Sequence, residues 1–235
     1  MNIYCLVHLD FETLGNIRDW ACEKEHSISV IMPSENQIYP DPNNIDLLII
    51  MGGLMSVYQE DEYPWLRQEK EFVSSVLSCR KAVYGICFGA QMLSELLGGQ
   101  VSRSQYREIG WHKVRSLVEF DKNDRLFNVQ NDLTVFQWHG DTFTLPSECR
   151  RLFESDACHE QGFIYGNNVL ALQFHLEVDE SCVENLLENC SSDLAEKGKY
   201  VSSGDEIRGR DDLLEASANL MFSILDWFEE MIENT

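Results

Sequence analysis

Short, wholly apolar runs alternate with longer amphipathic stretches over the first hundred residues, and this alternation limits the fold more than any other feature. The runs predict strands at residues 2–9, 27–32, 46–51 and 81–86, and the stretches predict helices at residues 12–25, 65–79 and 90–97. Strands that are apolar on both faces are typical of a parallel sheet that helices cover on both sides. The sequence therefore predicts an α/β fold around a mostly parallel sheet.

The pattern changes after residue 110. Strand-like segments separated by short polar turns follow at residues 110–119, 133–138, 152–155, 162–165 and 169–175, which predicts antiparallel additions to the sheet. From residue 179 onwards the chain is acidic and helical, with apolar residues such as Ile224 and Trp227 at helical spacing between residues 213 and 232. We expect this apolar stripe to pack on the core, with a docking surface for a partner as the alternative.

One domain is the simplest organisation for this chain. No internal repeat and no low-complexity linker interrupts the 235 residues, and this length is common for a single α/β domain. We therefore expect residues 1–235 to form one domain, in which residues 180–235 are a helical C-terminal extension.

Composition limits the partners that the chain can bind. The 40 acidic and 18 basic residues give a net charge of −22, which disfavours nucleic acid and anionic membrane surfaces because both are negatively charged. The start of the chain lacks a basic segment followed by a long apolar one, and no apolar run approaches the roughly 20 residues of a membrane span. We therefore expect a cytoplasmic protein without a membrane segment.

The cysteines give no sign of a metal site. No two of them form a CxxC pair, so neither a zinc site nor a small disulfide framework is indicated. A reduced, cytoplasmic setting is the simplest expectation, in which most of the thiols are small core or surface groups. The eight cysteines are Cys5, Cys22, Cys79, Cys87, Cys149, Cys158, Cys182 and Cys190.

Cys87 differs from the others in its local sequence. It lies in the segment Gly85-Ile-Cys-Phe-Gly89, directly after an apolar run and directly before a predicted helix. A tight turn from strand to helix holds a side chain clear of the sheet, and flanking glycines let neighbouring backbone approach closely. The N-terminus of the helix favours a thiolate, and the Phe88 N–H is placed to donate to an oxyanion. A nucleophile is one interpretation of this turn, and a buried structural cysteine is the other.

A cysteine nucleophile needs a base and a group that orients the base. His175 ends a predicted strand and Glu177 follows two residues later, so both side chains point to the same side of an extended chain. The carboxylate could orient the imidazole, although a surface salt bridge is the other interpretation. His139 is the rival base, or a plain turn residue before Asp141. His8, in the first predicted strand, is expected to be a core histidine.

Two glycines end the third predicted strand. Gly52 and Gly53 suit close approach of a ligand to the backbone, and open α/β sheets bind ligands at this edge. The Gly53 N–H could be a second donor to an oxyanion, and a plain turn is the alternative.

Together these segments resemble the class I glutamine amidotransferases, a family of Cys-His-Glu hydrolases. The matching motifs occur in the family's order and cover the chain from its first strand to about residue 180. Residues 107–114 and 136–146 resemble stand-alone relatives of the glutaminase domain of GMP synthase. The resemblance implies a flavodoxin-like three-layer sandwich, with a mostly parallel central sheet between helices. The motifs are Met51-Gly-Gly53, Gly85-Ile-Cys-Phe-Gly-Ala-Gln91, Gln137-Trp-His-Gly-Asp141 and Gln173-Phe-His-Leu-Glu177.

The resemblance also implies a chemical role for the matching residues. Cys87 attacks the side-chain amide carbon of glutamine, His175 transfers the proton to departing ammonia, and Glu177 orients His175. The N–H groups of Gly53 and Phe88 stabilise the oxyanion, and water hydrolyses the γ-glutamyl thioester to glutamate. The resemblance implies neither a cofactor nor a metal.

The substrate-binding residues follow from the same resemblance. In this view His139 is a loop residue of the substrate pocket and not the base. Leu176 and Leu54 stand where the family commonly has proline, which does not affect the reacting groups. The implied substrate-binding residues are Gly52, Gln91, Trp138, His139, Gly140 and Asp141.

The residues after Glu177 are too few for an ATP-binding synthetase domain. We therefore expect a stand-alone amidotransferase-type hydrolase, which supplies ammonia to a separate synthetase subunit or acts on free glutamine. One alternative is a γ-glutamyl peptide hydrolase with the same triad, because the two substrates differ only in the leaving amine. The other is a non-catalytic regulatory subunit. The sequence assigns neither the ammonia acceptor nor the oligomeric state.

Overall fold

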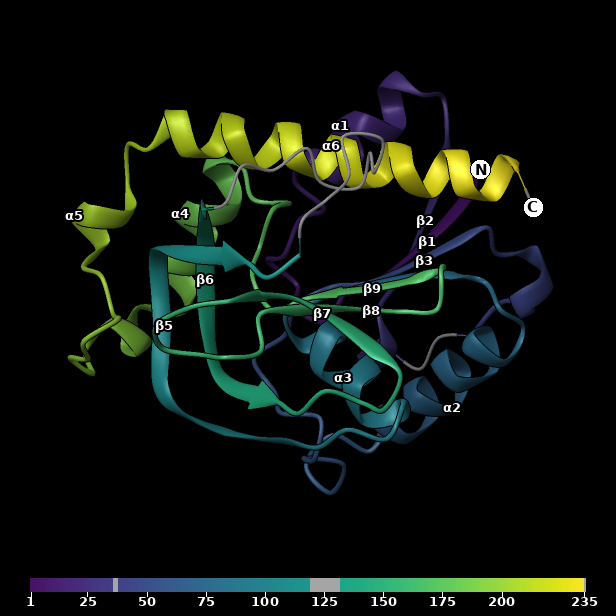
Figure 1. Cartoon of the computed structure of the whole chain (residues 1–235), viewed down its shortest axis with the longest axis horizontal. Coiled ribbons are helices and arrows are strands. Elements are labelled where there is room, and N and C mark those ends of the chain that lie inside the picture. Colours follow the sequence, from purple (N-terminus) through teal and green to yellow (C-terminus); the bar gives the residue numbers. More distant parts are fainter. Residues whose placement is uncertain (36–37, 119–131, 235) are drawn as a thin grey trace.

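The structure is a computed structural model that describes residues 1–35, 38–118 and 132–234. These residues form a nine-stranded sheet in the order β2-β1-β3-β4-β9-β8-β7-β5-β6 (Figure 1). The predicted α/β fold, with a parallel sheet extended by antiparallel strands, is confirmed. The parallel half consists of β1 (Asn2–Leu6), β2 (Ser27–Ile31), β3 (Leu47–Ile50), β4 (Ala82–Ile86) and β9 (Val169–Leu172).

Helices cover both faces of the parallel half. Successive side chains of a strand point to opposite faces, so Leu47 and Leu48 of β3 pack against different helices. Both are fully buried, which explains why β3 is apolar at every position. On one face lie α1 (Asn16–Glu23) and α6 (Asp211–Glu233), and on the other lie α2 (Trp65–Ser78) and α3 (Phe88–Leu96) (Figure 1).

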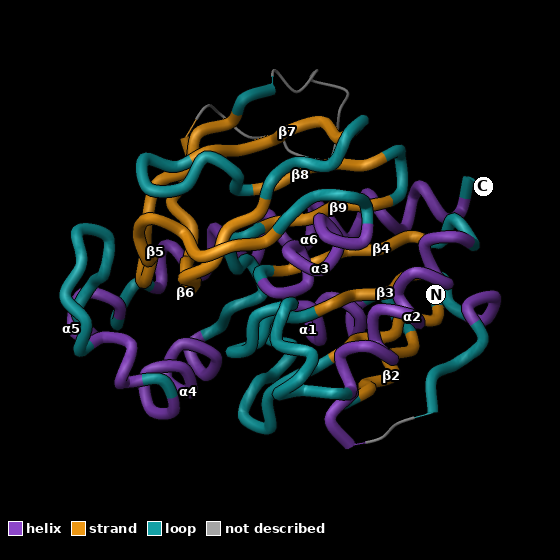
Figure 2. The backbone as a smooth tube through the Cα atoms, turned by 90° about the horizontal axis from the view of Figure 1, so that it is seen from below, coloured by secondary structure: helices purple, strands orange, loops and turns teal. Residues whose placement is uncertain are grey.

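The antiparallel strands β5 (Val101–Ser116), β6 (Asp132–Phe143), β7 (Cys149–Glu154) and β8 (Gly162–Tyr165) form the other end of the sheet (Figure 2). Three of them are longer than predicted, since β5 begins at residue 101 rather than 110, β6 ends at residue 143 rather than 138 and β7 begins at residue 149 rather than 152. The added part of β5 is more polar because four of its first six residues are exposed. Residue 119 of the predicted strand lies outside the described residues.

The start of one helix also differs from the prediction. The helix predicted at residues 12–25 begins only at Asn16, because Gly15 has a φ of +48° that breaks the helical path. Trp20 and Ala21, on the inner side of this helix, are both buried. The remaining elements are η1 (Pro33–Glu35), η2 (Pro42–Asn44), α4 (Glu180–Asn189), η4 (Ser191–Leu194) and α5 (Gly204–Ile207).

α6 packs along the sheet beside α1. Its buried face includes Met221, Ile224 and Phe228, and the Phe228 ring lies 6.0 Å from the ring of Tyr84 in β4. Trp227, which the sequence placed on the inner stripe, is only half-buried at the edge of this face. The helix therefore packs on the core, as expected. That residues 1–235 form one domain stays a prediction, and residue 235 lies outside the described residues.

Phe228→Ala tests whether the C-terminal extension and the sheet unfold together. Removal of this fully buried ring is expected to lower the free energy of unfolding of the whole chain by about 3–5 kcal/mol. The control Phe222→Ala, at a half-buried position of the same helix, should cost clearly less. Urea unfolding followed by circular dichroism and by tryptophan fluorescence measures both. Separate transitions for the two probes, with the main one unshifted, would contradict the single domain.

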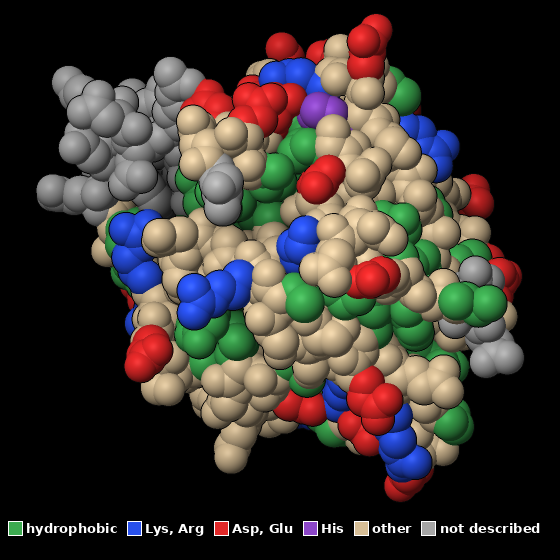
Figure 3. Space-filling model, turned by 90° about the vertical axis from the view of Figure 1, so that its right-hand side faces the viewer, with side chains coloured by type: hydrophobic (Ala, Val, Ile, Leu, Met, Phe, Trp, Pro, Cys, Tyr) green, Lys and Arg blue, Asp and Glu red, His purple; other side chains and the backbone are tan. Residues whose placement is uncertain are grey.

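The face in Figure 3 carries both acidic and basic side chains, and several Lys and Arg side chains lie near one another at its left. Acidic and basic side chains are interspersed there among polar and small apolar groups. Among the helices of the described residues, none is long and apolar enough to cross a membrane.

Candidate active site

Three neighbouring parallel strands end at the candidate site. Cys87 directly follows β4, Gly52 lies two residues after β3, and His175 lies three residues after β9. Because β3, β4 and β9 are adjacent in the sheet, their carboxyl ends bring these residues to one edge, where open α/β sheets bind ligands. The structure therefore brings together segments that lie far apart in the sequence.

Cys87 stands in a strained turn between β4 and α3. Its φ of +51° is unusual for a residue with a side chain, and such strain persists only where the surroundings enforce it. The Cys87 N–H donates to the Leu172 carbonyl at 2.8 Å. A Cβ on Gly85 would lie 2.6 Å from the Gly89 carbonyl oxygen, and a Cβ on Gly89 would collide with the Ile50 carbonyl. The glycines are thus required for close backbone packing, which fixes the thiol at the start of α3.

His175 and Glu177 form the expected pair. The Nδ1 atom of His175 lies 2.5 Å from Oε1 of Glu177, and both side chains are buried. Both residues lie beyond the end of β9, so the strand ends earlier than the predicted residue 175. Beyond the end of the strand the chain is still held to β6, because the His175 N–H donates to the Phe136 carbonyl at 2.9 Å. The surface salt bridge considered as an alternative is excluded by this burial.

The environment of His175 favours its protonated form. Burial by itself lowers the pKa of His175, but the Glu177 carboxylate and the contact with Cys87 outweigh it and hold the pKa well above its usual value. Nε2 of His175 is buried and has no hydrogen-bond partner among the described residues. This arrangement leaves one ring nitrogen for Glu177 and the other for a reacting group.

α1 holds the backbone of residues 176 and 177 in place. The Asn16 side chain donates to the Leu176 carbonyl at 2.8 Å, and its N–H donates to the Glu177 carbonyl at 3.0 Å. Gly15 lies against the same carbonyl, because a Cβ there would collide with the Glu177 oxygen. These contacts were not predicted from the sequence, in which Gly15-Asn16 before a helix is the only signal for them.

Gly15→Ala is expected to destabilise the protein by about 3–4 kcal/mol, since it adds a collision to the cost of a left-handed backbone. Gly209→Ala is the control, because Gly209 also has a positive φ of 66° but nothing lies within 4 Å of the position of a Cβ. It should cost about 1–2 kcal/mol. Urea unfolding of both variants makes the comparison, and equal losses would show that the contact with Glu177 is unimportant.

A cavity of about 360 Å³ opens beside Cys87. It is lined by the predicted residues Cys87, Gly53, Gln91, Trp138, His139, Gly140 and Asp141. Gly52, His175 and Glu177 lie on the other side of Cys87, around a second, smaller cavity. Cys87, Gly53 and Trp138 line both cavities, so the two groups of predicted residues meet there.

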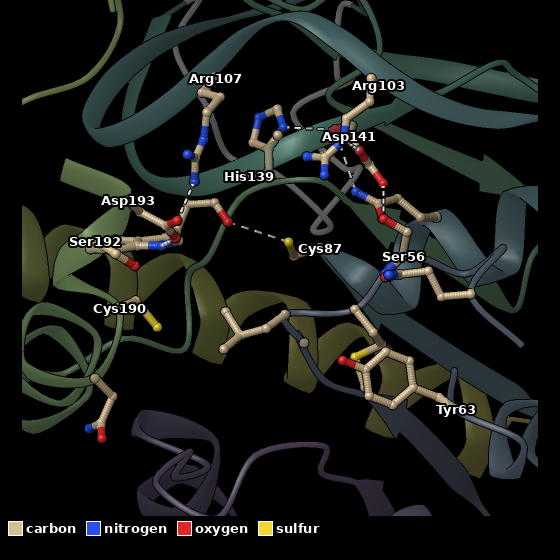
Figure 4. A pocket seen from close by; sticks show the side chains of 18 residues that line it. Ser56, Tyr63, Cys87, Arg103, Arg107, His139, Asp141, Cys190, Ser192 and Asp193 are labelled. Atoms are coloured by element: carbon tan, nitrogen blue, oxygen red, sulfur yellow. Dashed lines mark hydrogen bonds and ion pairs between the residues drawn. The ribbon is translucent and has the colours of Figure 1, made fainter. Parts of the chain in front are cut away.

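Charged residues that were not predicted from the sequence also line the larger cavity. On one side of Cys87, Arg107 contacts Asp193 at 2.7 Å, and on the other side Arg103 lies 3.5 Å from Asp141 (Figure 4). Asp193 belongs to η4, so the C-terminal extension forms part of the cavity wall. Only the three-dimensional structure brings this segment to the site, so no local sequence pattern could have identified it.

Gln91 and Asp141 lie within one hydrogen-bonded group. Nε2 of Gln91 donates to the Gln173 side chain at 3.2 Å and lies 3.5 Å from the Asp141 carbonyl. Gln173 in turn contacts the Cys87 sulfur at 3.5 Å, and Ser56 donates to the Asp141 carboxylate at 2.5 Å. The polar end of the cavity is thereby connected to the thiol.

The prediction that His139 lies in a loop is wrong. Residues 137–141 are part of β6, which pairs with β5 so that His139 stands opposite Glu108. Nε2 of the buried His139 lies 3.2 Å from Glu108, and Nδ1 lies 2.9 Å from the Asp141 carbonyl. Ser155 and Gln161 also donate to Glu108. His139 lines the cavity, as expected, but both of its ring nitrogens are already engaged.

Glu12 lies beside the His175 and Glu177 pair and titrates near neutrality. Burial raises the pKa of Glu12 to about 7, and the Glu177 charge adds to the shift while His8 and His175 oppose it. Because the pKa of a glutamate is about 4.3 in an unfolded chain, the folded state binds more protons between that pH and about 7. The contribution of Glu12 to the free energy of unfolding therefore falls as the pH rises through this window.

Glu12→Gln is expected to remove this pH dependence. At pH 8 the variant should be more stable than the wild type by about 1–2 kcal/mol, a value that allows for screening of the partly exposed side chain. At pH 4 the two proteins should be nearly equal, because the Glu12 carboxyl is then protonated in the folded state and mostly protonated in the unfolded state. Urea unfolding at both pH values tests this expectation. A difference in the free energy of unfolding between variant and wild type that is the same at both pH values would contradict it.

The comparisons with known proteins agree with the motifs. Residues 7–192 match the family described as glutamine amidotransferase class-I. A glutamine amidotransferase-like protein of Salmonella typhimurium is 30% identical over 88% of this chain and 90% of that protein. A γ-glutamyl peptidase of Arabidopsis thaliana is 26% identical over 72% of this chain and 71% of that protein.

Two further matches concern a glutamine-hydrolysing synthase and the fold. A subunit of the glutamine-hydrolysing GMP synthase of Picrophilus torridus is 28% identical over 74% of this chain and 92% of that protein. The crystal structure of a glutamine amidotransferase from Thermotoga maritima covers 97% of both chains, with a TM-score of 0.87 and 30% identity. The flavodoxin-like arrangement implied by the resemblance is therefore confirmed.

Proposed function

The chain belongs to the class I glutamine amidotransferase family, and we propose that it hydrolyses the side-chain amide of glutamine to glutamate and ammonia through a γ-glutamyl thioester. The observation that carries this proposal is the meeting of Cys87 with the buried His175 and Glu177 pair at the carboxyl ends of β4 and β9. The turn at Cys87, the pair of His175 and Glu177, and the adjoining cavity lie together at this edge of the sheet.

His175 is the proposed base and acid. Nε2 of His175 takes the thiol proton of Cys87, the raised pKa of His175 holds the proton there, and the resulting thiolate attacks the amide carbon. Glu177 fixes the tautomer by accepting from Nδ1 and stabilises the imidazolium. His175 then gives the proton to the departing nitrogen, which leaves as ammonia. A water molecule, deprotonated by His175, attacks the thioester carbonyl and releases glutamate and the thiol.

The N–H groups of Phe88 and Gly53 are the proposed oxyanion donors. Phe88 is the first residue of α3, so its N–H has no partner within the helix and points out of the helix start. Gly53 borders the cavity from the end of β3. Donors fixed in a site with little water stabilise the developing negative charge of the tetrahedral intermediate.

The larger cavity is the proposed site of the amino-acid end of the substrate. Arg103 and Asp141 place a positive and a negative group at its polar end, which suit an α-carboxylate and an α-ammonium group. Gln91, Gly52 and the backbone of residues 138–141 complete the proposed contacts. No cofactor and no metal enter the proposed reaction.

A γ-glutamyl peptide is the second proposed substrate. The cavity continues from Cys87 past Trp138 to Cys190 and Asp193, so it offers contacts beyond the γ-glutamyl group itself. The Arabidopsis relative is named a γ-glutamyl peptidase. Both substrates form the same acyl-enzyme and differ in the amine that leaves.

A substrate panel distinguishes these possibilities. Glutamine and a series of γ-glutamyl dipeptides are assayed for release of glutamate, and the ratio of kcat/KM values identifies the substrate. Mass spectrometry after exposure to a glutamine-derived electrophile tests the site independently, with an adduct expected on Cys87. A folded protein with neither turnover nor an adduct would contradict the proposal and leave the non-catalytic alternative.

We further propose that a separate synthetase subunit in the cytoplasm accepts the ammonia. The GMP synthase subunit named among the relatives supports a partner of this kind, and all eight cysteines are free, as a reducing compartment requires. Purification of the tagged protein from its native cell tests this proposal. Recovery of an ATP-dependent synthetase whose addition raises glutamine turnover would support it, and unchanged turnover with every co-purifying protein would contradict it.

A further inference from the structure

A buried ion pair outside the family motifs reaches the end of β3. His8, two residues beyond β1, and Glu69 of α2 have fully buried side chains. Nε2 of His8 lies 2.8 Å from Oε1 of Glu69, and Nδ1 lies 2.6 Å from the carbonyl oxygen of Gly52. His8 is thus a core histidine, as expected, but its second contact is with the glycine pair of the candidate site.

The chemistry of these two contacts fixes the proton on Nδ1. A carbonyl oxygen can only accept, so Nδ1 of His8 must carry a proton and donate it to Gly52. Glu69 contacts Nε2, the other ring nitrogen, and thereby keeps the proton on Nδ1. Burial by itself lowers the pKa of His8, but the charge and the hydrogen bond of Glu69 outweigh it and raise the pKa.

The bond to Gly52 determines where the Gly53 N–H points. The Gly52 carbonyl and the Gly53 N–H belong to one planar peptide unit, in which they point in opposite directions because the bond is trans. Holding the oxygen therefore aims the N–H. Both neighbours of this unit are glycines, so rotation of the peptide meets no Cβ. Within the described part of the chain the Gly53 N–H makes no backbone hydrogen bond of its own.

Aromatic side chains hold the His8 ring itself. Trp65 stacks on it with a centroid distance of 6.0 Å and an interplanar angle of 19°. Phe88 meets its edge at 4.8 Å and 68°. Since Phe88 carries the other proposed oxyanion donor, the imidazole of His8 contacts both halves of the proposed oxyanion site.

We propose that His8 and Glu69 are a positioning pair that fixes the peptide between Gly52 and Gly53 and so aims the Gly53 N–H at the oxyanion. The inference rests on the proposed function, because it assigns Gly53 the role of an oxyanion donor. Neither residue touches the substrate. The pair acts through the backbone of Gly53 and contributes to the rate of the chemical step rather than to substrate binding.

Two variants separate the donor function from the buried charge. The double variant His8→Leu with Glu69→Met removes both partners and leaves no unpaired buried carboxylate. His8→Asn, made together with Glu69→Gln so that it too leaves no buried carboxylate unpaired, keeps a side-chain N–H at the position of Nδ1 and serves as the conservative control. For glutamine, or the preferred γ-glutamyl substrate, the double variant should lose roughly 10²-fold in kcat, as expected for one oxyanion donor, while KM changes little. The conservative control should recover most of this loss.

A reaction that forms no oxyanion distinguishes loss of the aimed Gly53 N–H from general disruption of the site. Alkylation of Cys87 by iodoacetamide develops no oxyanion, so its rate should be the same in the wild type and in the double variant. Parallel losses of alkylation and turnover in folded protein would overturn the proposal, as would an unchanged kcat.

The conformation of Gly53 provides a readout that does not depend on turnover. In protein labelled with 15N-glycine, the Gly53 amide should give one signal in the wild type and in the conservative control, and a shifted or doubled signal in the double variant. An unshifted signal there would overturn the positioning role. A wild type that is inactive on every substrate would contradict the proposed function instead, so the two failures are distinguishable.

Discussion

Replacement of Cys87 by alanine should abolish turnover, with a loss of at least ~10⁴-fold in kcat. Without the sulfur no thioester can form, and the remaining groups offer only binding and oxyanion stabilisation to a direct attack by water. The fold should survive, because the change removes one atom from a side chain that borders a cavity. Steady-state release of glutamate measures the loss, and a thermal unfolding curve confirms that the variant is folded.

A second cysteine supplies the matched control for this experiment. Cys149 in β7 is half-buried, away from both cavities at the site, and burial raises the pKa of its thiol to about 11. Cys149→Ala should therefore keep wild-type turnover and the electrophile adduct on Cys87. More than a few per cent residual turnover in Cys87→Ala, with no contaminating hydrolase, would exclude Cys87 as the nucleophile.

Glu177→Gln should lower kcat by about 10²-fold to 10⁴-fold, the range for loss of the carboxylate that orients a catalytic histidine. The amide keeps nearly the same shape and can still accept from Nδ1, but it carries no charge to stabilise the imidazolium. Because Glu177 is the main group that raises the pKa of His175 against the effect of burial, the pKa should fall in the variant. The rate measured from pH 5 to pH 9 should then show the His175 ionisation at lower pH.

Glu184→Gln is the control for Glu177→Gln. Glu184 lies on α4 in an exposed ion pair with Arg208, and such pairs contribute little to stability. Its rate and pH profile should match those of the wild type. If Glu177→Gln behaved in the same way, Glu177 would have no part in orienting or charging His175, and the base would have to act without a third group.

The parallel core could be predicted well because its physical cause is local. Strands such as Leu47–Ile50 are buried on both faces, so every position must be apolar, and the run stands out in the sequence. The turn at Cys87 follows from the same kind of segment, since its glycines mark the close backbone contacts with Gly89 and Ile50. A few consecutive residues at the end of a strand therefore predict both the local fold and the position of the site residue.

The antiparallel half was predicted less well because the first part of β5 is largely exposed and because the sequence of β6 suggests a turn. Residues 101–109 include several exposed positions and three charged side chains, so their composition does not indicate a strand. Trp138-His-Gly-Asp141 suggested a turn, yet pairing with β5 holds these residues extended inside β6. Here cross-strand hydrogen bonds and the buried Glu108 override the local preference of the sequence.

The charged partners of the site depend on contacts between distant segments. His8 meets Glu69 across 61 residues, and Arg107 meets Asp193 across a still longer separation in the sequence. The spacing of residues within one strand or one helix predicts only near neighbours, and it found Glu177 beside His175 for this reason. No comparable rule links residues on different elements.

The sequence alone determined the α/β class, the order of the parallel strands along the chain and the positions of Cys87, His175 and Glu177, because each depends on the pattern of a short segment. Only the tertiary structure decided which cavity borders the thiol, which charges line it, and that His8 holds the Gly52 carbonyl opposite the Gly53 N–H. The physical reason is that hydrophobic patterning fixes what each element buries, whereas the packing of the elements fixes which polar groups then meet.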